Sequence, residues 1–521
     1  MPLTSSSPSQ LGPPELEADD AVAHVADGAT VAVTGSGGGV NEPDTLLEAL
    51  ERRFLGSGKP GGLIVYHPNG LGSARGGGTD CFAHDGFVRR VYGSHWSWAP
   101  KLSERALRGE FEIAVWPQGV LSQLLREAAG GRPGLVSPVG VGTYLDPEAD
   151  GQARPGRQIL PGSLRLDGQR WLHYHAPRVD VAIIRATTAD PEGNLTMEEE
   201  GTVLDLLAAA SAAKAAGGSV LAQVRRRSST PADPRQVRVP GCLVDALVVN
   251  PDQRQSALTS YNPAFCGDAR LPVTPPLPGD FARRFIAART ARELAPGMVV
   301  NVGFGVADGI PRLAAANGWA GSVIFSVEQG ALGGIPAWED DFGLMWNPSA
   351  ILDAPAVFDL YDGGALDAAL VSFAQVDPAG NVNVSYFGGR LIGPGGFMNI
   401  TRGARAVVFC GTLTAGGFRA EARDGRLAIV KEGTTAKFVP RCDQITFSAD
   451  EAARHGQRVL YVTERAVFRL RPDGIELAEI ATGLDVEADI LPAMGFRPRI
   501  SPTLREIDTD IVTAVRMGAG Q

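Results

Sequence analysis

The motif Asp-Pro-x-Gly-Asn occurs twice in this chain of 521 residues, at 190–194 and at 377–381. Each copy follows an apolar run, and this order of turn-forming residues is typical of a tight turn after a strand. The apolar runs 31–34 and 299–302 are a second matching pair, since each enters a Gly-rich turn that precedes a helical pattern. The distance between the copies is too long for a solenoid repeat. It predicts one α/β fold present twice, with extra residues in the first copy around 130–171.

Strand-like and helix-like segments alternate in both halves of the sequence. In the first half, the apolar segment 30–34 is followed by a helix that begins near Asp44, and the buried strand 179–185 is followed by the Ala-rich helix 204–216. Alternation of this kind is typical of parallel sheets covered by helices. We therefore predict the α/β fold class, with two related domains, largely parallel sheets and a functional site in the cleft between the domains.

A Pro-rich segment, 271–280, marks a boundary between the halves, because its four prolines are too many for a packed helix or strand. The sequence thus predicts an N-terminal domain over 21–272, a linker over 273–280 and a C-terminal domain over 281–521. The first residues are rich in Ser and Pro and lack an apolar core, so we expect a disordered tail over 1–20.

Composition limits the possible partners and the cellular location. The formal net charge of −10 argues against a nucleic-acid partner, because phosphate contacts need a basic face. No apolar run reaches the length of about 18 residues that a membrane span requires. The five cysteines are scattered, odd in number and without C-x-x-C spacing, which fits reduced thiols in a cytoplasmic protein. His173 and His175 lack a third ligand at a metal-site spacing, so we expect no bound metal.

Glu328 stands at the end of the apolar strand 323–327 and is followed directly by a Gly-rich turn. Sites of α/β folds lie at the carboxyl ends of their strands, so this position suits a reactive group. A carboxylate of ordinary pKa is ionised at neutral pH, and its attack on a thioester would give a mixed anhydride without ATP. By its local pattern alone, such a residue is more often a solvated carboxylate at a strand end.

Two further Gly-rich stretches are candidates for ligand contact. The segment 387–400 is rich in glycine, and its N–H groups can either point at one oxygen, as an oxyanion hole requires, or belong to a tight turn between strands. The segment 303–311 runs from strand to helix and resembles a phosphate cradle, but it lacks the dinucleotide fingerprint. His95 lies in an aromatic-rich loop, where it either lines a pocket or packs against its neighbours.

Several ordered segments together resemble the family I coenzyme A-transferases, nearest to the single-chain type that includes propionate and short-chain acyl-CoA:acetate CoA-transferases. The resemblance extends from about Ala21 to Val512. The segments that carry it are Trp116–Val120, Val139–Pro147, Glu328–Gly330, Gly333–Pro336, Phe358–Gly364 and Thr463–Phe468.

The resemblance implies a ping-pong transfer of CoA from a short-chain acyl-CoA to a carboxylic acid such as acetate, through a γ-glutamyl-CoA thioester on Glu328. Coenzyme A would be a co-substrate, and no cofactor would be bound permanently. The N–H groups of Gly395 and Gly396 would hold the oxyanions, helped by a side-chain amide from Asn41 or Gln118. Relatives of this type are commonly dimers or tetramers, so we expect a homodimer or homotetramer. The loop expected to contact CoA consists of Gly303, Phe304, Gly305, Val306 and Ala307.

Two positions depart from the family pattern. Pro394 stands where a small flexible residue is common, and the segment 338–340, Trp-Glu-Asp, follows the nucleophile turn where shorter side chains are frequent. Both could reshape the acyl pocket, so the sequence leaves the donor and acceptor acids open. Two other functions also stay open, namely an acyl-CoA hydrolase on the same scaffold and a non-catalytic CoA-binding protein.

Overall fold

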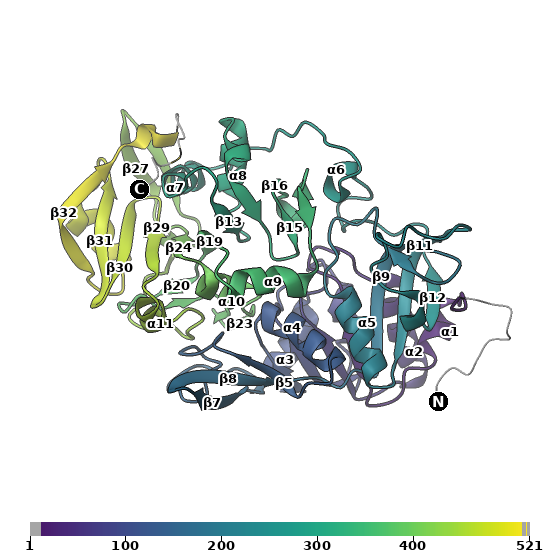
Figure 1. Cartoon of the computed structure of the whole chain (residues 1–521). Coiled ribbons are helices and arrows are strands. Elements are labelled where there is room, and N and C mark those ends of the chain that lie inside the picture. The colour runs from purple at the N-terminus through teal and green to yellow at the C-terminus, as the bar shows by residue number, and fades with distance from the viewer. Residues whose placement is uncertain (1–11, 513–516, 518–521) are drawn as a thin grey trace.

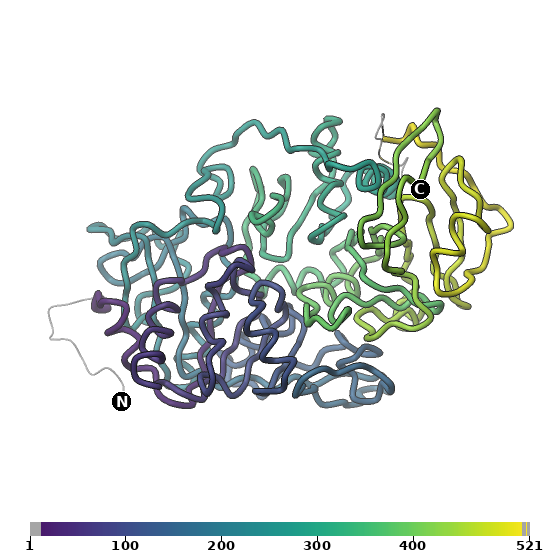
Figure 2. Tube along the Cα trace, turned by 180° about the vertical axis from the view of Figure 1, so that it is seen from behind, coloured from purple at the N-terminus to yellow at the C-terminus, as the bar shows by residue number. Residues whose placement is uncertain are grey.

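The computed structural model of the chain describes residues 12–512 and residue 517. The chain forms two α/β halves that lie side by side, each built around one large sheet (Figures 1 and 2). The first half runs from purple to teal in Figure 1 and contains a nine-stranded sheet, whereas the second half runs from teal to yellow and contains a ten-stranded sheet. These sheets confirm the predicted α/β fold class.

The sheet of the first half is parallel along its main path, which has the order β12-β11-β9-β1-β2-β3-β4-β6. All nine residues of β9 are buried, as expected for a parallel strand that is covered on both faces. The strands are β1 (Thr30–Val33), β2 (Leu63–His67), β3 (Val88–Gly93), β4 (Glu112–Ala114), β6 (Arg157–Gln158), β9 (Val181–Ala189), β11 (Ser219–Arg227) and β12 (Ala246–Val249), with β10 (Leu195–Thr196) antiparallel to β9. The helices are α1 (Ala18–Val22), α2 (Asp44–Ser57), α3 (Pro100–Leu107), α4 (Gln118–Ala129), α5 (Leu206–Ala215) and α6 (Pro263–Cys266).

The sheet of the second half has the order β18-β15-β14-β13-β19-β24-β29-β30-β31-β32. Its five central strands are parallel, and the pairings on both flanks are antiparallel except that of β31 with β32, which is parallel. The central strands are β13 (Val299–Val302), β14 (Ile324–Ser326), β19 (Ala368–Ser372), β24 (Ala406–Cys410) and β29 (Arg458–Val462). The flanking strands are β15 (Ala331–Leu332), β18 (Ala350–Ile351), β30 (Ala466–Arg471), β31 (Gly474–Ala481) and β32 (Arg499–Ile507). The helices are α7 (Phe281–Ala291), α8 (Gly309–Ala316), α9 (Ala354–Asp362), α10 (Phe397–Gly403) and α11 (Ala449–Arg454).

The two sheets share one strand order at their centres, β12-β11-β9-β1-β2 in the first half and β29-β24-β19-β13-β14 in the second. The two Asp-Pro turns are built alike. In each, one carboxylate oxygen of Asp190 or Asp377 accepts the N–H of Asn194 or Asn381, at 2.9 and 3.0 Å, and the other accepts that asparagine's Nδ2, at 3.0 Å in both. The predicted duplication is confirmed at the level of topology and of this turn.

The extra residues of the first half form a separate antiparallel sheet rather than extending the main one. Its strands have the order β5-β8-β7. Their bounds are β5 (Gly134–Ser137), β7 (Gly162–Leu166) and β8 (Gln169–His175). The second half carries short antiparallel pairs instead, which are β16 (Ile335–Pro336) with β17 (Met345–Trp346), β20 (Gln375–Val376) with β21 (Val382–Asn383), β22 (Tyr386–Phe387) with β23 (Arg390–Leu391), β25 (Thr414–Ala415) with β28 (Thr435–Ala436), and β26 (Arg419–Arg423) with β27 (Arg426–Lys431).

The predicted disordered tail is wrong for residues 12–20, while 1–11 lie outside the described residues. The N–H of Leu16 donates to the carbonyl oxygen of Leu247, at 2.8 Å, and the N–H of Leu247 donates to that of Pro14, at 2.9 Å. Helix α1 follows at Ala18. Because Leu247 lies on the edge strand β12, this segment satisfies backbone groups that would otherwise be open. The composition of these residues does not predict that they pair with the edge strand β12.

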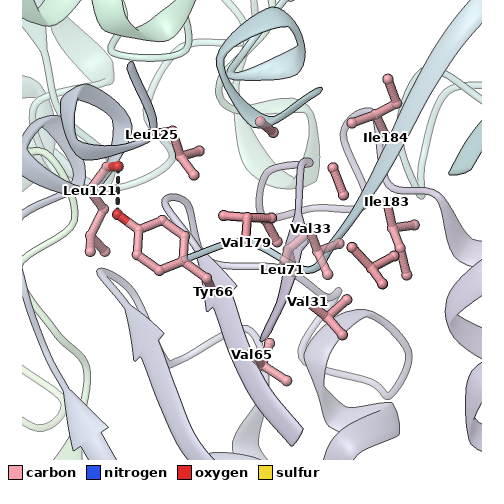
Figure 3. Packing of buried hydrophobic residues seen from close by; sticks show 14 of the residues in the cluster. Val31, Val33, Val65, Tyr66, Leu71, Leu121, Leu125, Val179, Ile183 and Ile184 are labelled. Atoms are coloured by element: carbon pink, nitrogen blue, oxygen red, sulfur yellow. Dashed lines mark hydrogen bonds between the residues drawn. The ribbon is translucent and has the colours of Figure 1, made fainter. Parts of the chain in front are cut away.

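The core of the first half joins the central strands to helix α4. Valines of β1 and β2 pack there with Leu125 and Ile183, and the hydroxyl of Tyr66 donates to the carbonyl oxygen of Leu121 at 2.7 Å (Figure 3). This buried bond ties β2 to α4, whose first residue is Gln118. Within 12–512 and at 517, no helix is both long and apolar enough to cross a bilayer.

Candidate active site

A cavity of about 540 Å³ lies between the two halves. Its walls come from both sheets, at the carboxyl ends of their parallel strands, which is the edge where α/β folds hold their ligands. In the first half, the lining residues that follow β1, β2, β3 and β4 are Ser36, Asn69, His95 and Gln118. In the second half, those that follow or end β13, β14 and β19 are Phe304, Glu328 and Ser372. The predicted site in the interdomain cleft therefore corresponds to a real cavity.

Glu328 lines this cavity two residues after β14 ends. Its Oε2 atom is buried and has no hydrogen-bond partner among the described residues. Burial raises the pKa of the Glu328 carboxyl from 4.5 to about 7, and hydrogen bonding to its own backbone N–H opposes this only in part. The ordinary pKa assumed from the sequence is therefore wrong, because that argument could not include the loss of water around the carboxylate.

Gly395 and Gly396 lie beside Glu328, between β23 and α10. A Cβ atom on Gly396 would be 3.3 Å from both Cβ and Cγ of Glu328, so a larger residue here would force Glu328 to move by a few tenths of an ångström. The N–H of Gly396 has no acceptor among the described residues, whereas the N–H of Gly395 donates to the carbonyl oxygen of Ser94 at 3.1 Å. Of the two N–H groups named from the sequence, only that of Gly396 is available to a ligand here.

Of the two side-chain amides named from the sequence, Gln118 is the one that lines the cavity. Its position is set by helix α4, whose first N–H, that of Gln118 itself, donates to the carbonyl oxygen of Gly395 at 2.9 Å. Its Nε2 donates to Oδ1 of Asn69 at 2.5 Å. The other candidate amide, Asn41, does not line this cavity, because its Nδ2 donates to the carbonyl oxygen of Thr202 at 2.8 Å. Asn41 is therefore set aside as a ligand contact.

The loop expected to contact CoA is divided by the structure. Gly303 and Phe304 line the cavity, whereas Gly305, Val306 and Ala307 do not. Ser372 pins the loop, since its Oγ accepts the N–H of Val306 at 3.2 Å and donates to the carbonyl oxygen of Phe304 at 3.1 Å. Gly305 has a φ of +108°, and a Cβ there would lie 2.9 Å from the same Ser372 oxygen. Gly303 and Phe304 are therefore the residues of this loop that a ligand in the cavity can contact.

Three aromatic rings from both halves meet at the cavity wall. Phe304 is 53% exposed, and its ring centroid lies 6.2 Å from that of Trp98 and 5.2 Å from that of Phe342. All three residues line the cavity. They place an apolar surface beside the loop that carries Phe304.

The three histidines named from the sequence lie in two different places. His95 lines the cavity, which decides between its two predicted roles, and burial lowers its pKa to about 4, so its ring is neutral. His173 and His175 lie on β8, outside the lining of this cavity, with ring centroids 4.5 Å apart. Within the described part of the chain, no group of three or more His, Cys, Asp or Glu side chains could hold a metal ion.

Asn69 is one of the polar lining residues that sequence reasoning missed, as are Ser36, Ser97 and Ser372. It is 2% exposed and comes two residues after β2. A signal for it was present in the duplication, because β2 and β14 hold the same place in the two sheets. The residues after β2 therefore correspond to the turn that carries Glu328. This correspondence could have predicted that a polar residue just after β2 lies at the site.

Both departures from the family pattern touch the lining of the cavity, the second through Asp340 alone. Pro394 lines the cavity. Trp338 does not, because its ring stacks on that of Trp346 with centroids 6.0 Å apart and planes 10° apart. Asp340 lines the cavity and pairs with Arg75 of the first half at 3.0 Å. The segment 338–340 therefore contributes a contact between the halves.

Comparison with known proteins assigns the family. Residues 16–250 match the family described as coenzyme A transferase. The chain is 41% identical to acetate CoA-transferase YdiF of Escherichia coli K12, over 97% of this chain and 96% of that protein. It is 38% identical to caffeate CoA-transferase of Acetobacterium woodii, over 95% and 97%. A crystal structure of YdiF from E. coli O157:H7, a thioester complex with CoA, matches with a TM-score of 0.92 and 39% identity, over 99% of this chain and 100% of that chain.

Two α/β domains of one topology around a shared cavity define the class of this protein as a two-domain α/β enzyme. The chain belongs to the coenzyme A transferase family, in its single-chain form, and is a CoA-transferase. The resemblance inferred from the sequence motifs is thereby confirmed.

Proposed function

We propose that this protein transfers CoA reversibly from a short-chain acyl-CoA to a free carboxylic acid such as acetate, through a γ-glutamyl-CoA thioester on Glu328. The observation that carries the proposal is the buried, unpartnered Oε2 of Glu328 in the cavity, beside the free N–H of Gly396. Two relatives named for acetate and caffeate transfer, and a relative crystallised as a CoA thioester, support the same chemistry.

The first half-reaction needs no separate base. An ionised oxygen of Glu328 attacks the thioester carbon of the acyl-CoA, the C–S bond breaks, and the CoA thiolate leaves a mixed anhydride. The thiolate then attacks the Glu328 carbonyl carbon, the anhydride C–O bond breaks, and the donor acid departs as its carboxylate. The acceptor carboxylate reverses both steps. A carboxylate with few hydrogen bonds is a better nucleophile than a fully hydrated one, so the burial of Glu328 favours its attack.

The tetrahedral intermediates carry negative charge on an oxygen that the protein must stabilise. The free N–H of Gly396 and the side-chain amide of Gln118 are the donors that we assign to this task. Gly395 acts through its carbonyl oxygen instead, which holds the first N–H of α4. Gly303 and Phe304 contact the CoA chain in this proposal, and the aromatic wall keeps water from the intermediate.

Covalent labelling tests the proposal. The protein is incubated with an acyl-CoA, treated with borohydride, digested and analysed by mass spectrometry. We expect reduction of the Glu328 carboxyl in the wild type and in Glu339→Gln, a control that changes an exposed carboxylate of the same half outside the cavity lining. Glu328→Gln should show neither label nor transfer. Absence of label in the wild type would favour a non-catalytic CoA-binding protein.

A second assay separates transfer from hydrolysis. Free CoA is measured in the presence of acyl-CoA alone and after addition of acetate. The aromatic wall of Trp98, Phe304 and Phe342 favours transfer, so CoA release without an acceptor should be slow. Rapid release that acetate does not change would identify an acyl-CoA hydrolase on this scaffold.

Location and assembly complete the proposal. We place the protein in the cytoplasm, which is supported by five unpaired cysteines, Cys81, Cys242, Cys266, Cys410 and Cys442. From the family resemblance we also propose a homodimer or homotetramer. Light scattering on the purified chain would measure the assembly, and a monomeric mass at working concentration would remove this part of the proposal.

A further inference from the structure

Three buried polar side chains form a line from the interior of the first half to the cavity. Gln118 is 3% exposed, Asn69 is 2% exposed and Asp205 is fully buried. Nε2 of Gln118 donates to Oδ1 of Asn69 at 2.5 Å, and Nδ2 of Asn69 donates to Oδ2 of Asp205 at 3.2 Å. The line ends at the carboxylate, and at its other end Gln118 lines the cavity.

The hydrogen-bonding chemistry of the three side chains determines how the two amide groups are oriented. An ionised carboxylate only accepts hydrogen bonds, so Asp205 requires the NH₂ side of the Asn69 amide. The oxygen of Asn69 is then turned to Gln118, which must present its own NH₂ group in return. One N–H of the Gln118 amide is used by Asn69, and the second has no acceptor among the described residues, so it is available to a ligand oxygen. If a group that can both donate and accept hydrogen bonds replaced Asp205, the side-chain amides of Asn69 and Gln118 could both flip by about 180°.

Asp205 is well placed for such a role. It precedes helix α5, yet its side chain makes no capping hydrogen bond to that helix, so the usual structural use of an aspartate there is absent. The preceding residue, Leu204, is buried with a φ of +55°, a backbone conformation that a leucine rarely adopts. The carbonyl oxygen of Leu204 accepts the N–H of Ala354 in the second half at 2.9 Å. Contacts from both halves therefore fix the position of Asp205.

The backbone of Asn69 is also held. Its carbonyl oxygen lies 2.5 Å from Nδ1 of His67, and burial lowers the pKa of His67 to about 4, so the neutral ring donates its proton there. Because the main chain of Asn69 is fixed, the remaining freedom of this residue is the orientation of its side-chain amide. That orientation is what the contact with Asp205 determines.

We propose that Asp205 is a positioning residue, which acts through Asn69 to keep an N–H of the Gln118 amide turned into the cavity. The inference rests on the proposed function, in which Gln118 stabilises the oxyanion of the transfer reaction. It adds to that function a carboxylate that never touches the substrate and whose negative charge determines which face of the Gln118 amide the substrate meets.

The test compares steady-state transfer by the wild type, Asp205→Asn, Gln118→Ala and the double variant. The assays run at pH 8, where Asp205 is ionised, since burial raises its pKa to about 7. Loss of one oxyanion donor typically lowers kcat about 10²- to 10³-fold. A Gln118 amide that flips between its two orientations still donates part of the time, so Asp205→Asn should lower kcat only about tenfold. The KM for acyl-CoA should change by less than about threefold, because the substrate's ground state is bound by other residues.

Non-additivity is the decisive result. If Asp205 acts only through Gln118, Asp205→Asn has no further effect on kcat in the Gln118→Ala background. An equal loss in both backgrounds, or a wild-type kcat in Asp205→Asn, would overturn the inference. Should Asp205→Asn fail to fold, Asn69→Ala replaces it, with the same expected loss and the same expected absence of effect beside Gln118→Ala.

The failure of this inference can be told from the failure of the proposed function. Covalent labelling of Glu328 does not require Asp205, so a labelled wild type together with a fully active Asp205→Asn rejects the positioning role alone. Conversely, full transfer by Glu328→Gln rejects the proposed function. The coupling between Asp205 and Gln118 would then still be measured on the turnover that remains.

Discussion

Replacement of Gly396 by alanine should affect the rate of CoA transfer more strongly than the stability of the fold. Gly396 has a φ of −78° and a ψ of −6°, which alanine adopts without strain. The added methyl group would lie 3.3 Å from Cβ and Cγ of Glu328 and 3.0 Å from Cδ1 of Ile400. Contacts of this length require the neighbours to move by a few tenths of an ångström, so the cost falls on the position of Glu328.

The expected effects on stability and activity are therefore unequal. The unfolding free energy should change by less than about 1 kcal/mol, since the entropy lost from the unfolded chain offsets part of the tight packing. Misplacement of a reacting group by about 1 Å costs about 10²-fold in rate, so a shift of a few tenths of an ångström should lower kcat about 3- to 6-fold. The assay is steady-state CoA transfer at saturating acid, together with thermal unfolding of the same samples.

A matched control adds the same methyl group where nothing opposes it. Gly56 lies within helix α2, and a Cβ there has no atom within 4 Å. Gly56→Ala should raise stability by about 0.5–1 kcal/mol and leave transfer unchanged. If Gly396→Ala keeps the kcat of the wild type while remaining folded, the close approach of this loop to Glu328 is not needed for the reaction, and the argument from that contact is refuted.

Three further outcomes follow from the structure. The rate of Glu328 labelling by acyl-CoA should fall about tenfold for each pH unit below the raised pKa of about 7 and should level off above it, because only the ionised carboxyl attacks. A labelling rate that does not change with pH would contradict this. Glu328→Gln should stabilise the fold by on the order of 1–3 kcal/mol at pH 8, where the wild type buries a charge, and the gain should vanish below the unfolded pKa of 4.5, as thermal unfolding against pH would measure. Asp377→Ala, which removes both bonds to Asn381, should cost about 1–2 kcal/mol in denaturant unfolding with unchanged KM, and an altered KM would mean that the turn also shapes the site.

Local pattern and repetition were enough for the architecture and for the place of the site. The paired Asp-Pro turns depend on hydrogen bonds within five consecutive residues, so their chemistry can be read from the chain itself. Parallel order follows from alternating strands and helices, and the position of Glu328 after an apolar strand points to the edge where both halves meet.

Other properties depend on atoms that are distant in the chain. Asn41 and Gln118 are both amides near strand ends, and only packing decides that Gln118 faces the cavity. The N–H of Gly395 is taken by Ser94, about 300 residues away in sequence, which no local motif reveals.

The amino-acid sequence by itself determined the duplicated α/β fold, the family and the carboxylate on which the proposed chemistry depends, because these follow from periodicity and short motifs. Only the tertiary structure decided the raised pKa of Glu328, the N–H of Gly396 that has no acceptor among the described residues, and the link from Asp205 to Gln118. Burial and hydrogen-bond direction depend on which groups exclude water from one another, and that is settled only when the two halves pack together.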